Sequence, residues 1–316
     1  MNETSTILIT GASGMVGKSL VSALKEKGFK KIVTLSLKEI DLRNQEGVDN
    51  YFKNTHIDYV FHLAARVGGI AANIAAPAEF LYDNLVMECN IIESARKYGV
   101  EKLLFLGSSC IYPKECIQPM KEDYLMTGKL EPTNEGYAIS KIAGLKLCEY
   151  YNRQHATNYL SLIPCNMYGI NDHFNLKSSH VISALITKFH NAKVNKLPFV
   201  EVWGTGNARR EFLYVGDMID AMIYFMEKYD AKDMLSFVNI GMGEDISIKD
   251  LAKLIGDVVG YKGEIKFDTS KPDGMMKKLL DVSLAKKLGW TAKTDLKKGL
   301  KLTYDWYKKI YCNEKN

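Results

Sequence analysis

The sequence predicts an α/β fold: a doubly wound parallel sheet with a smaller C-terminal α/β lobe. Three observations lead to this prediction. Short apolar runs alternate with helical patterns through the first half of the chain, the first run ends in a glycine-rich turn, and the alternation loosens after about residue 166. Strands that alternate with helices form parallel sheets whose two faces are both covered.

Five strands with helices between them are predicted in the first half. The apolar runs that predict strands lie at residues 7–10, 31–37, 59–63, 102–106 and 160–164. Apolar residues at helical spacing predict the main helices at residues 15–27, 78–98 and 137–154. These connections are long enough for the right-handed crossovers that join parallel strands.

The looser second half is predicted to form the smaller lobe. Helices are expected at residues 181–191, 248–259 and 296–308, and short strands at 200–203 and 264–267. Residues 237–241 form an apolar run that we expect to rejoin the main sheet. We therefore assign residues 1–165 to the first domain, with 212–243 returning to it, and residues 166–211 and 244–316 to the second lobe.

The composition excludes several classes of protein. In 316 residues, Lys and Arg exceed Asp and Glu by only five charges, too few for a nucleic-acid-binding surface. The six cysteines form no CxxC pair and no zinc-binding spacing with histidine, so we expect free thiols in a reducing compartment and no metal. No apolar run is long enough to cross a bilayer and no signal-peptide pattern is present, which predicts a cytoplasmic protein.

The turn after the first strand has the spacing of a dinucleotide-binding loop. Gly11, Gly14 and Gly17 lie between this strand and the first helix. The first glycine permits a tight turn, the second lets backbone N–H groups approach a pyrophosphate, and the third lets the helix pack closely on the sheet. A helix N-terminus also attracts the anion. This context predicts a Rossmann-type domain, the alternative being a purely structural turn.

The end of the second strand indicates which dinucleotide binds. An acidic residue there would hold the ribose 2′-OH of NAD. The strand instead ends with Ser36 and Lys38, and no carboxylate comes before Glu39. Ser36 and Lys38 are candidates to bind a 2′-phosphate, so NADP (NADPH) is the predicted cofactor; the alternative is that Lys38 is a solvated surface lysine. Asp41 and Leu42 are candidates to face the adenine.

A tyrosine and a lysine one helical turn apart predict a carbonyl-reducing site. Tyr137 and Lys141 share one face of the predicted helix. The ammonium is expected to lower the pKa of the phenol, which can then give its proton to a carbonyl oxygen as a hydride arrives. Ser108 and Ser109 follow the fourth strand at its carboxyl end, where ligands bind in open α/β sheets.

Longer stretches around these motifs resemble the extended short-chain dehydrogenase/reductases. More narrowly, they are similar to the GDP-L-fucose synthase family, the 3,5-epimerase/4-reductases of GDP-4-keto-6-deoxy-D-mannose. The similarity runs through nearly the whole chain. It is carried by GMVGKSL from Gly14, AARVGGI from Ala64, LLFLGSSCIYPK from Leu103, LEPTNEGYAISKIAGLKLCEYYNRQ from Leu130, SSHVI from Ser178, VWGTGNARREFLYVGDM from Val202 and SKPDGMMKKLLDV from Ser270.

The resemblance implies two sets of catalytic residues. Ser108, Tyr137 and Lys141 would form the reductase triad, and Cys110 and His180 the acid/base pair for epimerisation at sugar C3 and C5. The chemistry agrees, because a C4 ketone acidifies both neighbouring C–H groups and inversion needs a base on one ring face and an acid on the other. A thiol and an imidazole both change protonation near neutral pH. Taken alone, either residue would be interpreted as structural.

The remaining candidates bind ligand or pack in the core. The residues expected at the cofactor are Gly11, Gly14, Met15, Val16, Gly17, Ser36, Lys38, Asp41, Leu42, Ala64, Ala65, Lys141, Pro164 and His180. By resemblance, Lys188, Trp203 and Arg210 contact the GDP part, with Asn166, Asp273 and Lys278 as further substrate candidates. The guanidinium of Arg can form two parallel hydrogen bonds to a phosphate. The alternatives are that Lys188 is a surface lysine, that Trp203 belongs to the core and that Arg210 forms a structural ion pair. Cys89, Cys148 and Cys165 are expected in the core.

Two departures from the family pattern flank the predicted substrate site. Ile170 stands where the family usually has proline, and His173 where it has asparagine; Gly136 precedes the catalytic tyrosine where some relatives carry proline. Three functions therefore stay open. They are the dual epimerase/reductase that makes GDP-L-fucose, a C4 reductase of a related GDP-4-keto sugar (6-deoxy-hexose or heptose) with little or no epimerase activity, and a sensor that binds NADP without turnover. An intact triad argues against the third.

The two longest predicted helices also suggest an assembly. Residues 78–98 and 137–154 carry much apolar surface. In related reductases such helices pair across a twofold axis, and a twofold dimer is the commonest soluble oligomer. We therefore expect a homodimer, the alternative being that both helices only cover their own sheet.

Overall fold

The computed structural model describes residues 1–176, 179–271 and 273–312, with the backbone alone at residue 312. Its larger part is a six-stranded parallel sheet in the order β10-β5-β4-β3-β1-β2. The strands are β1 (Thr6–Thr10), β2 (Lys31–Leu35), β3 (Tyr59–His62), β4 (Lys102–Leu106), β5 (Tyr159–Pro164) and β10 (Val238–Ile240). This is the predicted doubly wound sheet, and the segment at 237–241 does rejoin it.

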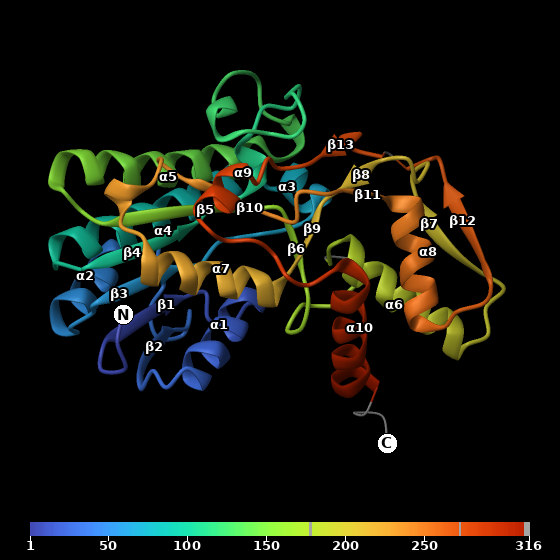
Figure 1. Ribbon diagram of the computed structural model, residues 1–316, viewed down its shortest axis with the longest axis horizontal. Coiled ribbons are helices and arrows are strands. Elements are labelled where there is room, and N and C mark those ends of the chain that lie inside the picture. The colour runs from blue at the N-terminus through green and yellow to red at the C-terminus, as the bar shows by residue number, and fades with distance from the viewer. Residues whose placement is uncertain (177–178, 272, 313–316) are drawn as a thin grey trace.

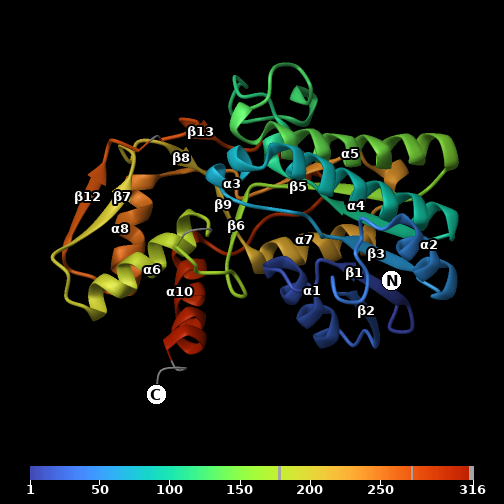
Figure 2. The same ribbon diagram turned by 180° about the vertical axis from the view of Figure 1, so that it is seen from behind.

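Helices cover both faces of this sheet (Figure 1). One face carries α2, α4 and α5, and the other carries α1 and α7, as the view from behind in Figure 2 also shows. Their bounds are α1 (Met15–Glu26), α2 (Gln45–Asn54), α4 (Pro77–Lys97), α5 (Glu135–His155) and α7 (Val215–Lys228). The chain therefore crosses the sheet repeatedly, as parallel strands require.

A second lobe lies beside the sheet (Figure 1). Its helices are α6 (Val181–Val194), α8 (Ile248–Val259) and α10 (Leu296–Tyr307), and α10 continues into one π-helical turn. Its strands are β7 (Phe199–Trp203), which pairs with β12 (Glu264–Asp268), and β8 (Arg209–Arg210), which lies between β11 (Ile246–Ser247) and β13 (Lys277–Lys278). The pair β6 (Asn166–Tyr168) and β9 (Phe212–Tyr214) connects the two parts. Two short helices complete the chain: α3 (Ile70–Ala75), which precedes α4, and α9 (Ser283–Lys287), whose Ala285 is buried in the main core.

Local sequence signals set the ends of the lobe helices. The Ser247 hydroxyl accepts a hydrogen bond of 3.0 Å from the Asp250 N–H and caps the start of α8. Gly260 ends the same helix in the left-handed region, at φ +75°, which glycine adopts without steric cost. Asp295 caps α10 in the same way through the Lys298 N–H. These three helix ends coincide with the predicted ones.

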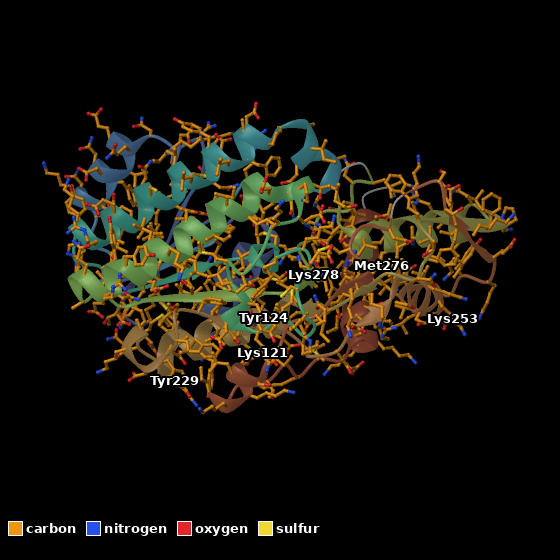
Figure 3. All side chains as sticks on the ribbon, turned by 90° about the horizontal axis from the view of Figure 1, so that it is seen from above. Lys121, Tyr124, Tyr229, Lys253, Met276 and Lys278 are labelled. Carbon is orange, nitrogen blue, oxygen red and sulfur yellow. The ribbon has the colours of Figure 1, made fainter. Side chains whose placement is uncertain are left out.

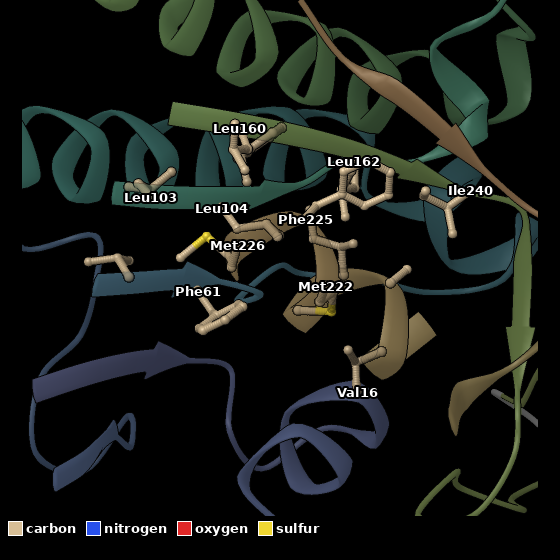
Figure 4. Packing of buried hydrophobic residues seen from close by; sticks show 14 of the residues in the cluster. Val16, Phe61, Leu103, Leu104, Leu160, Leu162, Met222, Phe225, Met226 and Ile240 are labelled. Carbon is tan, nitrogen blue, oxygen red and sulfur yellow. The ribbon is translucent and has the colours of Figure 1, made fainter. Parts of the chain in front are cut away.

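The main hydrophobic core lies between the sheet and its helices. In Figure 4, Met222, Phe225 and Met226 of α7 pack towards Phe61 of β3 and Leu104 of β4. All five are at most 1% exposed. Complete burial of such a side chain stabilises a fold by about 1.5–3 kcal/mol. A separate buried cluster, which includes Ile186 of α6, Leu251 of α8 and Leu300 of α10, holds the second lobe together.

Two expectations are corrected. The second strand ends at Leu35 rather than at residue 37, so Ser36 and Lys38 lie in the turn that follows. Cys89, expected in the core, is exposed, whereas Cys148 and Cys165 are buried. Consecutive residues on a helix point about 100° apart. In α4 the neighbour, Glu88, takes the inward direction and Cys89 points out.

The described part of the chain contains no helix long and apolar enough to span a membrane. Within the same residues, no group of three or more His, Cys, Asp or Glu side chains is placed to hold a metal ion. The five cysteines whose side chains are described form no disulfide with one another.

Candidate functional site

The three glycines of the first turn have the different environments that their predicted roles require. Gly11 has φ +69°, and a Cβ there would lie 2.7 Å from the Ala64 amide nitrogen. A Cβ on Gly17 would collide with the Gly11 carbonyl oxygen, so α1 can approach the turn only with glycine at this position. A Cβ on Gly14 would meet only the Gly11 carbonyl oxygen, at 3.5 Å. The protein leaves the space beside Gly14 open, at the N-terminus of α1.

The open side of this turn faces the point where the sheet reverses its order. From β1 the chain goes to β2 on one side and then to β3 on the other. The Thr10 hydroxyl accepts hydrogen bonds of 3.1 Å from both the Leu63 and the Ala64 N–H, which fixes the loop after β3 against the glycine turn. Ligands of open α/β sheets bind at such a switch point. The other predicted cofactor residues vary in burial: Met15, Ala64 and Ala65 are half-buried, and Val16 and Pro164 are buried.

A carboxylate unexpectedly lies at the end of β2. The Ser36 N–H and hydroxyl both donate to Glu39 Oε2, at 2.8 and 2.7 Å. These hydrogen bonds lower the pKa of Glu39. Lys38 is exposed. No acidic residue precedes Glu39 at this strand end, as the sequence shows. The turn nevertheless brings the Glu39 carboxylate into contact with Ser36, one of the two residues predicted to bind a 2′-phosphate.

Asp41 and Leu42 lie just beyond this turn in different surroundings. Asp41 accepts hydrogen bonds from Arg43, the shortest of them 2.7 Å from Nη2 to Oδ2. Arg43 also donates to Asp83 of α4, and Asp83 in turn accepts from Arg66 at 2.7 Å. Leu42 is 6% exposed and packs in the main core. The network ties the loops after β2 and β3 to α4.

The structure brings the predicted reductase triad together at the carboxyl end of β4. Ser108 follows this strand and caps the short turn η1 (Ser109–Ile111), where its hydroxyl accepts from the Cys110 N–H at 3.4 Å. Tyr137 lies at the start of α5, close enough to Ser108 for that side chain to lower the pKa of its phenol. Lys141 lies one turn further along α5 with its Nζ 5.9 Å from the centre of the Tyr137 ring.

The pKa of Tyr137 departs from the expected direction. Lys141 was expected to lower it. In the structure burial raises the pKa of Tyr137 well above its ordinary value, Cys110 and Glu88 raise it further, and the Ser108 hydrogen bond lowers it. Loss of solvation, together with Cys110 and Glu88, disfavours the phenolate more strongly than Ser108 favours it. Tyr137 therefore carries its proton at neutral pH, as a proton donor must.

Lys141 is held from three sides. Its Nζ donates a hydrogen bond of 3.1 Å to the Leu106 carbonyl, lies 4.8 Å from the centre of the Phe105 ring, and lies 3.1 Å from Glu88 Oε1. Glu88 was not singled out from the sequence. The one signal for it is a charged residue on the apolar face of the helix at residues 78–98, but its partner is visible only once the two helices are packed.

Cys110 is buried beside the triad, and the charge of a lysine from the second lobe acts on its thiol. Burial raises the pKa of the Cys110 thiol, while Lys278, the Ser108 hydrogen bond and Lys141 act in the opposite direction. Lys278 belongs to β13, and Figure 3 shows it near the middle of the molecule, between the two lobes. Burial in turn lowers the pKa of Lys278, and Cys110 opposes that change. A predicted substrate residue is thus also the main cation acting on Cys110.

No hydrogen bond or ion pair between described residues connects His180 to the cluster of Ser108, Cys110, Tyr137 and Lys141. His180 immediately precedes α6, and it is exposed. Ser178, which belongs to the same family motif, lies outside the described residues. The pairing of His180 with Cys110 in epimerisation stays a prediction.

The predicted nucleotide end gathers around an exposed tryptophan. Trp203, at the end of β7, is 62% exposed. Lys188 of α6 and Lys271 place their Nζ atoms 5.5 and 5.7 Å from the centre of the Trp203 ring. Lys188 also donates to the Glu201 carbonyl at 2.9 Å, and burial lowers its pKa. An exposed aromatic ring flanked by two cations suits a base or sugar that carries phosphates.

Arg210, Asp273 and Asn166 have backbone or turn partners. Arg210 donates to the carbonyls of Arg209 and Asp273, and burial lowers its pKa. The Asp273 carboxylate accepts from the N–H and hydroxyl of Thr205, at 2.8 and 2.7 Å, and so fixes the turn after β7. Asn166 donates to the Glu211 carbonyl at 3.0 Å.

The segment that departs from the family pattern is anchored by its buried acid. Asp172 accepts hydrogen bonds from the Ser183 hydroxyl and, at 2.8 Å, from the His173 N–H. The side chain of His173 is 53% exposed, so the substitution presents an imidazole at the surface. A Cβ on Gly136 would lie 2.6 Å from the Pro77 carbonyl oxygen, which shows how closely the starts of α4 and α5 approach.

Known proteins resemble this chain over nearly its full length. A model of the NAD dependent epimerase/dehydratase family matches residues 7–241. The chain is 47% identical over 312 residues to GDP-L-fucose synthase 1 of Arabidopsis thaliana, a match that covers 99% of this chain and 96% of that protein. It is 48% identical over 307 residues to GDP-L-fucose synthase of Escherichia coli, covering 95% and 96%.

A solved structure is similar over the same extent. It is the GDP-mannoheptose C4 reductase from Campylobacter jejuni with NADP bound, at a TM-score of 0.92 and 39% identity, covering 98% of this chain and 99% of that one.

Proposed function

The chain belongs to the NAD dependent epimerase/dehydratase family, and on that premise we propose that it reduces the C4 ketone of a GDP-4-keto-6-deoxy-mannose-type sugar with NADPH. The same site performs 3,5-epimerisation, so that the product is GDP-L-fucose. The protein is an oxidoreductase of the extended short-chain dehydrogenase/reductase type. Two relatives at 47–48% identity are GDP-L-fucose synthases.

One observation carries the reductase assignment. The Tyr137 phenol is buried close to Ser108 and to the Lys141 ammonium, whose Nζ lies 5.9 Å from the centre of its ring, and burial raises its pKa well above the ordinary value. The group keeps its proton at neutral pH until an acceptor with developing negative charge lies next to it. The oxygen of a ketone that receives a hydride is such an acceptor.

The residues of the first turn fit a dinucleotide. Space beside Gly14 is open, and the N–H groups at the start of α1 point towards it without a side-chain cap. We assign binding of the 2′-phosphate to Ser36 and Lys38, in the turn after β2. The bound dinucleotide supplies the hydride. Ser108 orients the sugar ketone, Tyr137 gives its proton to the C4 oxygen, and Lys141 stabilises the phenolate that remains.

Epimerisation uses the neighbouring thiol. Cys110 is two residues from Ser108, so it can reach the same ketone-bearing sugar, and the Lys278 ammonium favours its thiolate. The thiolate removes a proton from the carbon next to the ketone. His180 returns a proton to the opposite face, which inverts the centre.

A second candidate function is reduction without epimerisation. It is favoured by the imidazole of His173 at the surface of a substrate-flanking segment, and by the resemblance to a structure described as a GDP-mannoheptose C4 reductase. The substrate would then be a related GDP-4-keto sugar, a 6-deoxy-hexose or a heptose. An NADP sensor is disfavoured, because a sensor needs no buried proton donor.

On this proposal the two parts of the chain bind different ligands. Residues 1–165, with 212–243, bind the dinucleotide, and residues 166–211 and 244–316 bind the GDP-sugar. The protein acts in the cytoplasm as a homodimer. The outer faces of α4 and α5, which carry the exposed Tyr82, Ile139 and Tyr150, supply the dimer surface.

The function is tested by incubation with NADPH and a panel of GDP-4-keto sugars in deuterated water. Loss of NADPH reports reduction, and deuterium at C3 and C5 reports epimerisation. Deuterium in both positions together with NADPH oxidation supports the dual enzyme. NADPH oxidation without deuterium supports the second candidate, and no turnover of any 4-keto sugar contradicts both.

A further inference from the structure

A fully buried carboxylate lies directly behind the reductase triad. The Glu88 side chain of α4 is 1% exposed and that of Lys141 is 3% exposed, and their Oε1 and Nζ atoms are 3.1 Å apart. Neither carboxylate oxygen of Glu88 accepts a hydrogen bond from any described residue. The ion pair with Lys141 is thus the polar interaction that the described structure offers this group.

The neighbouring helix is shaped to admit this carboxylate. A Cβ on Gly144 of α5 would lie 2.6 Å from Glu88 Oε2 and 2.6 Å from Cζ of Phe105. A glycine inside a helix costs roughly 1 kcal/mol relative to alanine. The close approach that it permits puts the Glu88 carboxylate, the Phe105 ring and the Lys141 ammonium in one contact group.

Few other charged or titratable groups face this pair. On α5 they are Tyr137, whose pKa Glu88 raises, and Cys148. On β3 the neighbour of Lys141 is His62, and in the turn after β4 it is Cys110, whose pKa Lys141 lowers. On α4 itself Cys89 adjoins Glu88. Burial lowers the pKa of His62 to about 3, so its ring is neutral. Lys141 is therefore the single described cation whose charge acts on the pKa of Glu88.

Glu88 changes its protonation in the physiological range. Burial raises its pKa to about 7, and Lys141 opposes the shift. Above that pH the carboxylate is charged and pairs with the ammonium. Below it the carboxyl is neutral and the electrostatic hold on Lys141 is lost, so the geometry of the triad depends on a group that does not touch the substrate.

We propose that Glu88 is a positioning residue for the reduction: its charged carboxylate helps to hold the Lys141 ammonium next to Tyr137, and uptake of a solvent proton by Glu88 weakens this hold. This inference rests on the proposed ketone-reductase function. The negative charge has a second effect, because it balances the ammonium and so keeps the proton on the Tyr137 phenol until the substrate oxygen takes it.

The test uses the full-length protein, NADPH and a 4-keto sugar already in its final configuration, across about pH 6 to about pH 9. Glu88→Gln keeps the shape and removes the charge, and Glu88→Asp keeps the charge but withdraws it by one methylene. Glu93→Gln is the matched control, since Glu93 lies on the same helix and bonds to Arg96 and Tyr151 instead. Circular dichroism melting confirms that each variant is folded.

We expect wild type and Glu93→Gln to lose kcat as pH falls through about 7, the pKa of Glu88. Glu88→Gln should have a kcat lower by about tenfold or more above that pH, the scale of one lost interaction with a charged group, and no decline near 7. Its KM for the sugar should stay within about threefold, because the lost interaction is not with the substrate. Glu88→Asp should lose less kcat than Glu88→Gln, and its kcat should decline at a pH different from that of wild type.

A second measurement does not depend on turnover. Infrared difference spectra of the free protein between about pH 6 and about pH 8, on either side of the Glu88 pKa, should contain the C=O band of a buried carboxylic acid, absent in Glu88→Gln. If wild type reduces no 4-keto sugar, the proposed function fails and this band alone decides the inference. An unchanged kcat profile in Glu88→Gln, or a band that persists there, overturns it. If Glu88→Gln does not fold, a Glu88→Asp profile identical to wild type has the same consequence.

Discussion

The hydroxyl of Ser36 donates a hydrogen bond of 2.7 Å to the carboxylate of Glu39, so a negative charge lies at the end of β2. That charge would repel a 2′-phosphate bound at Ser36 and Lys38. The effect is moderated by solvent, because both residues are exposed. We therefore predict that NADPH is preferred to NADH but that Glu39 limits its affinity.

The first prediction follows from this relationship. Glu39→Gln should lower the KM for NADPH by a factor of about two to five and leave that for NADH unchanged, the range for exposed charge pairs. Lys38→Ala should raise the KM for NADPH alone. Steady-state kinetics with the two cofactors measures both effects. Equal or better kinetics of wild type with NADH would show that Ser36 and Lys38 do not bind the phosphate.

The second prediction concerns the proton donor. Tyr137→Phe removes the phenolic hydroxyl and should reduce kcat by about 10²-fold or more, the contribution of general acid catalysis. NADPH affinity, measured by fluorescence titration, should stay close to that of wild type. Near-normal turnover would contradict the mechanism.

The third prediction separates the two reactions. Cys110→Ser replaces an ionisable thiol by a hydroxyl, so deuterium exchange at C3 and C5 should collapse while a 4-keto sugar of the final configuration is still reduced. His180→Gln should also impair exchange more than reduction. Lys278→Met removes the cation that favours the Cys110 thiolate and should move the pH dependence of exchange to higher pH. Parallel losses of exchange and reduction in all three variants would argue against separate roles.

The fourth prediction concerns stability and pH. Burial raises the pKa of Glu211 to about 7, above its ordinary value of 4.5, although the N–H groups of Leu280 and Gly243 bond to its carboxylate. The folded state then binds a proton that the unfolded state has lost. This stabilisation is complete below about pH 4.5 and is lost as pH rises through about 7.

Glu211→Gln removes that titration. The free energy of unfolding of wild type relative to Glu211→Gln should therefore fall with rising pH in this interval, by at most about 1.4 kcal/mol per pH unit. Urea unfolding of both proteins at several pH values measures the difference. Parallel curves would show that Glu211 is ionised throughout.

The fifth prediction concerns the dimer. Tyr82, Ile139 and Tyr150 are 64%, 41% and 46% exposed on α4 and α5. Light scattering at micromolar concentration should give twice the chain mass, and Ile139→Lys should shift it towards the monomer. A monomeric wild type would show that the two helices only cover their own sheet.

Much of the fold was predictable because its signals are local. The strands β1, β3, β4 and β5 are continuous apolar runs, and α5 places Tyr137 and Lys141 on one face by helical spacing alone. The Gly11 turn was identified by its neighbours in sequence. In α7, which was not predicted, Met222, Phe225 and Met226 make an apolar face that was overlooked within the looser half of the chain.

The rest of the site depends on packing between distant segments. Glu88 meets Lys141 only because α4 and α5 lie side by side, and Lys278 reaches Cys110 through a strand that is paired in the second lobe. The Glu39 carboxylate returns to Ser36 through a turn whose shape the residue types did not reveal. Cys89 was misplaced because the inward direction on α4 belongs to the residue before it.

The late position of β10 in the chain has a consequence for biosynthesis. The strand β5 is completed at residue 164, but its outer neighbour β10 begins at residue 238, after residues 166–211 of the second lobe and after α7. Until the ribosome has released that stretch, β5 presents an unpaired apolar edge, the kind of surface that recruits other chains. A nascent or truncated chain that stops before Val238 is therefore expected to aggregate more readily than the full chain, and the rate at which this stretch is translated sets how long the edge is exposed.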